Sequence, residues 1–313
     1  MSFFKLIRIS NLFILALSLS LFYYLIIVPV HFNQLGTTLV PLTNFEFALF
    51  VLSVILIAAA GNIINDYFDF ALDKKFKTER PLPQAKISLD QAIYLHALFA
   101  FAGIVIGFYL GWKNNITRIG FLFVIASVLL YLYSAYLKKT PLAGNLVVAA
   151  LAAFPFILLL IFEVNFLNTI TFEKGTYVFD ILKWQIFFYA GFAFLTNLAR
   201  EIVKDIEDRE GDAEFKINTI SVQFGDNTAK IFASFVLVIL LGVLSFFMKT
   251  FFDSYARKEF YYLLFAVAFP VFALLVLLFS AKEKKHYSRI SVLLKIIMLL
   301  GILSIPAFYH FNK

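Results

Sequence analysis

Long apolar runs recur along almost the whole chain, and they limit what it can fold into more than any other feature. Each run is about as long as the roughly 20 residues that a helix needs to cross a bilayer. They lie at about residues 12–30, 45–65, 92–112, 119–137, 143–162, 184–203, 229–248, 260–280 and 290–309. We therefore predict an all-α, polytopic membrane bundle of about nine transmembrane helices, in a single domain spanning residues 1–313.

Composition agrees with a lipid environment. Hydrophobic residues make up 62% of the chain and charged residues only 15%, against about 25% charged residues in a typical soluble domain. The chain has no cysteine, which excludes disulfides, thiolate metal sites and cysteine nucleophiles. The net charge of +7 comes from basic residues interspersed between apolar runs. This pattern favours the bilayer as a partner and argues against nucleic acid.

The distribution of basic residues predicts the orientation. Lys5 and Arg8 precede the first apolar run; its length and the lack of a small-residue cleavage site predict a retained helix rather than a signal peptide. Most other Lys and Arg residues fall in segments on the same side as the N-terminus. The positive-inside rule then predicts a cytoplasmic N-terminus in the inner or plasma membrane. The polar loops at 66–91 and 204–228 are expected on that side too.

Two apolar runs end in polar residues with identical spacing. After the second run the residues at i, i+4, i+7 and i+11 are Asn62, Asp66, Asp69 and Asp73. After the sixth run the same spacing gives Glu201, Asp205, Asp208 and Asp212. On a 3.6-residue period each set forms one stripe. Charged side chains in a membrane helix cost about 2.5–3.5 kcal/mol each at mid-bilayer, so matched stripes favour function over ordinary surface charge.

The six aspartates suit a magnesium–diphosphate site, because Mg²⁺ prefers a few carboxylates together with waters and substrate phosphates. Such a site remains strongly negative, so cations are expected beside it. The candidate diphosphate-binding residues are Asn62, Asn65, Lys77, Arg80, Arg200 and Lys204. Tyr133 and Lys138, at the link between the fourth and fifth helices, are candidate catalytic residues, with Lys138 expected to serve the acceptor. Glu201 is the candidate base.

The sequence resembles the UbiA superfamily of intramembrane prenyltransferases. The resemblance rests on NDYFDFALD followed by RPLP, on KDIEDREGD, and on YSAYLK followed by a P–x–x–GN pattern. Within the superfamily, GNIINDYFD and REIVKDIEDREGD are most similar to the digeranylgeranylglyceryl phosphate synthase branch. The resemblance implies Mg²⁺, a prenyl diphosphate donor and an allylic carbocation attacked by the hydroxyl of a prenylated glycerol phosphate.

Two alternatives remain open at this stage. Gln84 and Ala85 stand where a Ser–Gly pair is expected after RPLP, which leaves an aromatic acceptor of the kind used in quinone synthesis as the second candidate. A cation-coupled transporter could also place acids within its helices. Transporters, however, usually bind ions near the bilayer midplane, whereas these acids are expected at helix ends.

Overall fold

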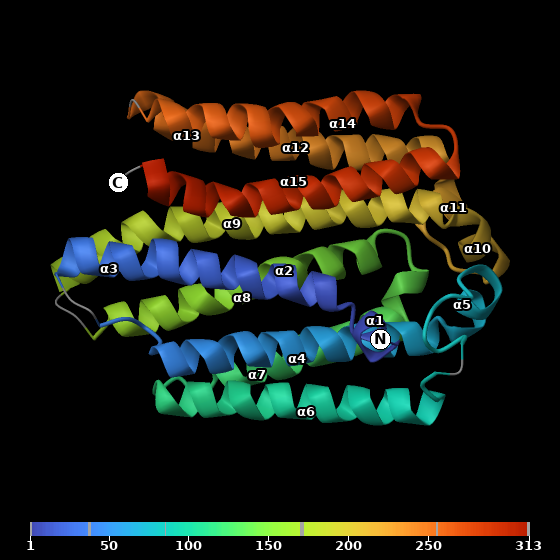
Figure 1. The fold of residues 1–313 in the computed structure, drawn as a ribbon, viewed down its shortest axis with the longest axis horizontal. Coiled ribbons are helices and arrows are strands. Elements are labelled where there is room, and N and C mark those ends of the chain that lie inside the picture. Colours follow the sequence, from blue (N-terminus) through green and yellow to red (C-terminus); the bar gives the residue numbers. More distant parts are fainter. Residues whose placement is uncertain (1, 37–38, 85, 170–171, 255, 312–313) are drawn as a thin grey trace. The chain divides into compact units, whose positions relative to one another are not determined.

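Helices account for all the regular structure in the part of the chain that the computed structural model describes, which is residues 2–36, 39–84, 86–169, 172–254 and 256–311. Ala85 lies outside these residues. The first half contains α1 (Ser2–Leu6), α2 (Ile9–Phe22), α3 (Val28–Leu35), α4 (Asn44–Phe68), α5 (Phe70–Phe76), α6 (Leu89–Lys113), α7 (Ile119–Ala135) and α8 (Ala143–Leu167). The second half contains α9 (Phe172–Glu207), α10 (Arg209–Glu214), α11 (Ile220–Phe224), α12 (Asp226–Asp253), α13 (Arg257–Tyr262), α14 (Phe269–Ser280) and α15 (Lys284–Phe311). Figure 1 shows their order.

The predicted membrane helices are present. Within the described residues, eight helices are long and apolar enough to cross a membrane, and α7 is a shorter apolar helix of 17 residues. The first span, Ile9–Asn33, is built from α2, a π-helical turn at Tyr23–Ile27 and α3. A second π-helical turn, Leu263–Ala268, joins α13 to α14. The all-α membrane fold is therefore confirmed.

The chain divides into two compact units. Unit 1 contains residues 1–20, 39–138 and 161–172, which include α1, α4, α5, α6 and α7. Unit 2 contains residues 21–38, 139–160 and 173–313, which include α3 and the helices from α9 to α15. Whether the two units act as a single domain stays a prediction.

Side-chain caps fix where the helices of unit 1 begin. At the start of α4 the Thr43 hydroxyl accepts from the backbone N–H of Glu46, and the Glu46 carboxylate accepts from the Thr43 backbone N–H. Ser88 and Gln91 form the same reciprocal pair at the start of α6. Such capping boxes satisfy N–H groups that the first helical turn leaves without partners. In α4 this fixes the end of the helix opposite the acidic stripe.

A close approach joins α4 to α6. A Cβ atom on Gly103 would lie 2.7 Å from Cγ1 of Ile57 and 3.0 Å from the backbone oxygen of Ser53. The Ser53 hydroxyl donates to the Gly103 carbonyl at 2.6 Å. Small residues and short polar links of this kind hold helices together in membranes, where lipid competes equally for apolar surface. The contact supports the helix that carries the first stripe.

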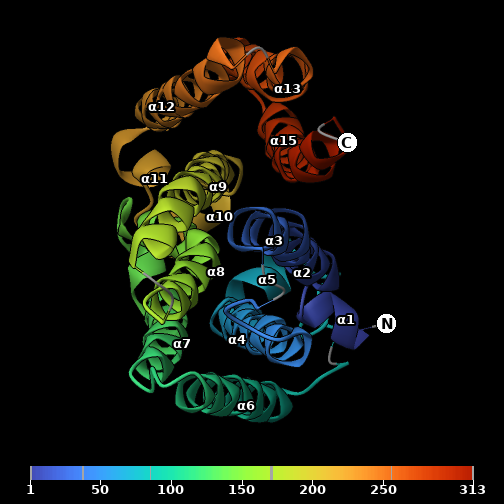
Figure 2. The ribbon, with the colours of Figure 1, turned by 90° about the vertical axis from the view of Figure 1, so that its left-hand side faces the viewer.

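In unit 2, α9 packs against α15. A Cβ atom on Gly301 would lie 2.3 Å from the ring of Phe192, and Tyr189 shares a buried hydrogen bond of 2.8 Å with Ser304. Figure 2 shows α9, α12, α13 and α15 from one end. The packing supports α9, which carries the second stripe.

Candidate active site

The first stripe continues without loss of register past the end of its helix. α4 ends at Phe68, Asp69 forms a one-residue turn, and α5 follows. Hydrogen bonds of the helical type cross the turn, from Asp69 N–H to Asn65 C=O at 3.0 Å and from Asp73 N–H to Asp69 C=O at 2.8 Å. Asp66, Asp69 and Asp73 are all buried, with exposed fractions of 4%, 9% and 1%. The predicted stripe of three aspartates at a helix end is therefore present.

Each of these aspartates is paired with a cation. The Arg80 Nη1 group donates to Asp66 Oδ1 at 3.1 Å and to Asp73 Oδ2 at 2.6 Å. Arg8 Nη2 donates to the same Asp66 oxygen at 2.8 Å, and Lys138 donates to Asp69 Oδ2. We call these residues the first acidic cluster: Arg8, Asp66, Asp69, Asp73, Arg80 and Lys138. Its three formal negative charges are balanced by three positive ones.

Asp69 and Asp73 lie beyond α4 and differ in their electrostatics. Burial acts to raise the pKa of Asp69, but the charge and hydrogen bond of Lys138 outweigh it and leave that pKa below its ordinary value. Burial raises the pKa of Asp73 to about 6, against the opposing charge of Arg80. Asp73 is therefore the carboxylate of this pair whose ionised form is less well stabilised.

The second stripe repeats this backbone arrangement. α9 ends at Glu207, Asp208 forms the turn, and α10 follows. The Asp208 N–H bonds to the Lys204 carbonyl at 2.8 Å and the Asp212 N–H to the Asp208 carbonyl at 3.0 Å. Asp212 is buried, whereas Asp205 and Asp208 are half-buried. The matched spacing in the sequence thus corresponds to matched local structure.

The side chains around the second stripe come from two helices. The Asn145 amide, on α8, donates to Asp205 Oδ2 at 2.8 Å. Glu201 accepts from Arg200 Nη1 at 2.8 Å and from Lys204 Nζ at 3.5 Å. We call these residues the second acidic cluster: Asn145, Arg200, Glu201, Lys204, Asp205, Asp208 and Asp212. The first cluster lies in unit 1 and the second in unit 2, so their joint action on one substrate stays a prediction.

The remaining candidates in unit 1 differ in their contacts. Asn65 Nδ2 donates to Asp69 Oδ2 at 3.0 Å, so it orients a carboxylate. Asn62 Nδ2 donates instead to the backbone oxygen of Ile7 at 2.9 Å. Lys77 and Tyr133 are half-buried. Their roles at the diphosphate or acceptor stay predictions.

Two residues of these clusters were not predicted as site residues. Arg8 was interpreted only as a positive-inside charge, and nothing in the local sequence places it beside Asp66, which is 58 residues away. Asn145 follows the YSAYLK segment in the P–x–x–GN pattern, and that pattern was the signal that could have assigned it. Both contacts depend on tertiary packing.

The first stripe has the chemistry of a site for a hard divalent cation. The Oδ1 atom of Asp73 is buried and has no hydrogen-bond partner among the residues that the structure describes, and carboxylate oxygens are the ligands that Mg²⁺ prefers. Within the described residues, no three His, Cys, Asp or Glu side chains already converge on a metal-binding geometry. In the first acidic cluster, arginine and lysine groups bind the carboxylate oxygens instead. A divalent cation fits if some of these ion pairs rearrange.

The apolar helices, with acidic clusters at the ends of two of them, place the chain in the class of integral membrane proteins. The UbiA prenyltransferase family model matches residues 35–301. The chain therefore belongs to the UbiA prenyltransferase family and is a prenyltransferase. Family membership argues against the transporter alternative.

Comparison with individual proteins gives the same family. The chain is 33% identical to digeranylgeranylglyceryl phosphate synthase of Methanothermobacter thermautotrophicus, over 84% of this chain and 86% of that protein. A solved structure from work on digeranylgeranylglyceryl phosphate synthase in membranes is similar with a TM-score of 0.62 and 24% identity, covering 97% of this chain and 96% of that one. A UbiA homologue from Archaeoglobus fulgidus, bound to GPP and Mg²⁺, is similar with a TM-score of 0.57 and 15% identity, covering 98% and 100%.

Proposed function

We propose that the protein transfers a geranylgeranyl chain from geranylgeranyl diphosphate to the hydroxyl of geranylgeranylglyceryl phosphate. The observation that carries the proposal is the first acidic cluster, in which three buried aspartates are neutralised by cations from three other segments of the chain. The 33% identity to a protein named for this activity supports the choice of acceptor.

The proposed metal is Mg²⁺, held by aspartates of both stripes: Asp66, Asp69, Asp73, Asp205, Asp208 and Asp212. When bound, Mg²⁺ stabilises the negative charge that develops on the leaving diphosphate. The Archaeoglobus fulgidus homologue, whose structure contains GPP and Mg²⁺, supports this ion for the family. That both stripes serve one diphosphate is part of the proposal.

The basic residues have a second task in this reaction. Arg80 and Lys138 now pair with the aspartates; with a divalent cation on those carboxylates, both would be able to bind another anion, and a guanidinium can bind phosphate through two hydrogen bonds. Arg200 belongs to the same proposal on the second stripe, because its Nε atom is buried and has no hydrogen-bond partner in the described part of the chain. Preorganised positive charge at the leaving group lowers the barrier to ionisation.

The acceptor determines whether a base is needed. An alcohol loses a proton when it attacks the allylic carbon, whereas an aromatic ring carbon can attack the carbocation without prior deprotonation. Glu201 is the proposed base, and its two ion pairs with Arg200 and Lys204 hold the carboxylate in place. Tyr133 is proposed to line the acceptor side, as the sequence predicts. The sequence predicts the same role for Lys138, but its ion pair with Asp69 favours the donor side.

The test is product analysis with purified protein in lipid nanodiscs. Labelled geranylgeranyl diphosphate is offered with Mg²⁺ and, in separate reactions, geranylgeranylglyceryl phosphate or hydroxybenzoate. We expect a labelled ether lipid in the first reaction only. Labelled hydroxybenzoate instead would overturn the acceptor and favour the quinone-type activity. Asp253→Ala, which removes an exposed acid at the end of α12, should form the same product. It is the matched control for variants that remove an aspartate of either stripe.

We also propose that the N-terminus and the two acidic helix ends face the cytoplasm, on the basis of the positive-inside rule. The lack of cysteine makes a direct test possible. Lys139→Cys lies on the proposed cytoplasmic side and Lys113→Cys on the opposite side; both positions are exposed. In intact cells, an impermeant thiol reagent should label Lys113→Cys alone, and the reverse pattern would contradict the orientation.

A further inference from the structure

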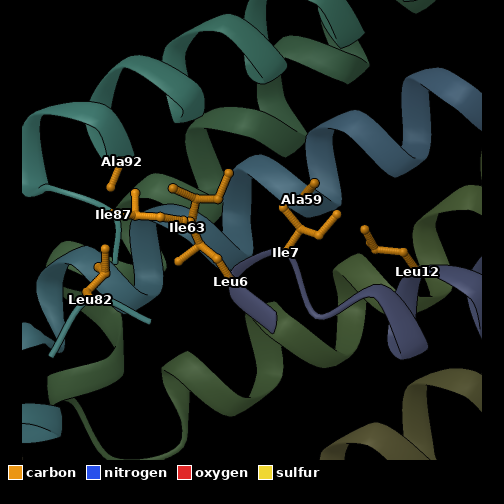
Figure 3. Close-up of a cluster of buried hydrophobic side chains, with 8 residues drawn as sticks. All are labelled: Leu6, Ile7, Leu12, Ala59, Ile63, Leu82, Ile87 and Ala92. Carbon is orange, nitrogen blue, oxygen red and sulfur yellow. The ribbon is translucent and has the colours of Figure 1, made fainter. Parts of the chain in front are cut away.

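Residues at the start of the described chain, Leu6 and Ile7, pack onto the helix that carries the first stripe. Leu6 is fully buried and Ile7 has an exposed fraction of 7%. They belong to one buried cluster with Ala59 and Ile63 of α4, and Figure 3 shows these side chains beside one another. The segment is too short to form a stable helix alone, so this packing is what holds α1 in place. We call residues 2–8 the N-terminal strap.

Two polar contacts fasten the end of the strap to the stripe. Asn62 donates to the Ile7 carbonyl at 2.9 Å, and Arg8 donates to Asp66 at 2.8 Å. Between them, Arg8 has a backbone φ of 54°, in the left-handed region that residues other than glycine rarely adopt. Such conformations persist where surrounding contacts impose them, and they are common at ligand-binding sites.

We propose that Arg8 is an anion-binding residue of the donor site and that Asn62 is the positioning residue that holds Arg8 there through the strap. This inference rests on the proposed function. It gives Asn62 a different task from direct diphosphate binding, because its amide N–H group is already used by the strap. It also adds to the site a residue that lies outside both acidic motifs.

The charge arrangement around Asp66 supports the role of Arg8. A single oxygen, Asp66 Oδ1, accepts from both Arg8 and Arg80. A carboxylate that binds a divalent cation no longer needs two guanidinium partners. The Arg8 side chain is 30% exposed, whereas that of Asp66 is 5% exposed. Arg8 is therefore a cation held at the stripe whose accessible face can bind phosphate.

A double-mutant cycle of Arg8 and Asn62 shows whether Asn62 positions Arg8 or binds the diphosphate directly. The probe is inorganic diphosphate with Mg²⁺, and its binding to the full-length protein in nanodiscs is measured by calorimetry. Arg8→Gly removes the guanidinium but permits the positive φ, and Asn62→Ala removes the link to Ile7. We expect each single variant to weaken binding about tenfold or more. Arg8→Gly loses a charge-assisted hydrogen bond to the diphosphate, and Asn62→Ala loses the hydrogen bond to Ile7 that holds Arg8 in position. The double variant should bind no more weakly than Arg8→Gly alone.

Two results of the double-mutant cycle would contradict the inference. Additive losses would mean that Asn62 contacts the ligand itself. Wild-type binding by Arg8→Gly would remove Arg8 from the site. Arg8→Lys should recover part of the affinity, since it restores the charge without the planar fork. Lys5→Ala, which removes an exposed charge from the same strap, is the matched control and should bind like wild type.

The strap itself can be followed without any ligand. A nitroxide attached to Phe4→Cys reports on the mobility of α1; Phe4 is 55% exposed, and the natural chain has no cysteine to interfere. We expect the Asn62→Ala change to increase the mobility of this label and Asp253→Ala to leave it unchanged. An equally immobile label in Asn62→Ala would exclude the positioning role.

The outcomes also separate this inference from the proposed function. If Asp205→Ala abolishes prenyl transfer while Arg8→Gly binds diphosphate normally, only the strap inference fails. If neither stripe is needed for transfer, the proposed function fails, whatever the mobility of the strap.

Discussion

At the scale of single residues, the first acidic cluster is a set of buried carboxylates whose charges are balanced by half-buried cations. Removing one partner of a buried pair leaves the other charged and poorly solvated, which usually costs more than the pair itself contributes. Arg80 is the most consequential partner because it bonds to both Asp66 and Asp73. Exposed pairs are different, since water solvates each partner after the other is removed.

Two arginine variants should therefore differ in stability. We expect Arg80→Ala to lower the free energy of unfolding by about 2 kcal/mol or more in the absence of divalent cations. Arg209→Ala, which breaks the pair between Arg209 and Asp226 with exposed fractions of 46% and 35%, should cost about 0–1 kcal/mol. Thermal melting in detergent with EDTA measures both. Equal shifts would show that the ion pairs of Arg80 do not stabilise the fold.

Lys138 allows the donor and acceptor roles to be distinguished. The sequence predicts an acceptor role, whereas the observed pair with Asp69 places the ammonium group at the metal stripe. We expect Lys138→Ala to raise the apparent KM for the prenyl diphosphate, by about tenfold if one charge-assisted hydrogen bond is lost. The acceptor KM is measured in the same variant. An increase confined to the acceptor would return Lys138 to the role that the sequence predicts.

At the scale of elements, helix type and number follow from the sequence, but breaks and contacts between helices do not. Hydrophobicity alone locates the eight long apolar helices and the shorter α7 of the described residues, because a membrane tolerates few other structures. The π-helical turn at Tyr23–Ile27 left no sequence signal that we recognised. The spacing of Asp66, Asp69 and Asp73 predicted one stripe, which is present. The contact of Arg8 with Asp66 could not be predicted, because it depends on how α1 packs against α4.

The close contact between α4 and α6 gives a prediction at this scale. Gly103→Ala would place a methyl group 3.0 Å from a backbone oxygen that cannot rotate away. We expect a loss of about 1–3 kcal/mol in stability, as for other overpacked sites. Gly242→Ala is the matched control, since nothing lies within 4 Å of the added Cβ. It should leave the melting temperature unchanged or raise it slightly, because alanine favours helix. Equal melting temperatures for the two variants would show that α4 and α6 can separate at little cost.

At the scale of the whole molecule, the two stripes lie in two compact units, one in each. In the proposed reaction, aspartates of both stripes hold the metal ions of one diphosphate. A ligand that binds only the folded protein stabilises it by about 2.7 kcal/mol when present at 100 times its dissociation constant. If one ligand engages both stripes, its stabilising effect must depend on each stripe separately.

We therefore expect Mg²⁺ with a geranylgeranyl diphosphate analogue to raise the melting temperature of the wild type, and this rise to vanish in both Asp66→Ala and Asp205→Ala. Both variants should also lose prenyl transfer while still inserting into the membrane, because each lacks a metal ligand and not a packing group. If each variant kept about half of the ligand-induced shift, the stripes would bind independent ligands. If the two stripes bind one diphosphate, removal of either aspartate abolishes the whole ligand-induced rise in melting temperature. This holds although Asp66 and Asp205 lie 139 positions apart in the chain.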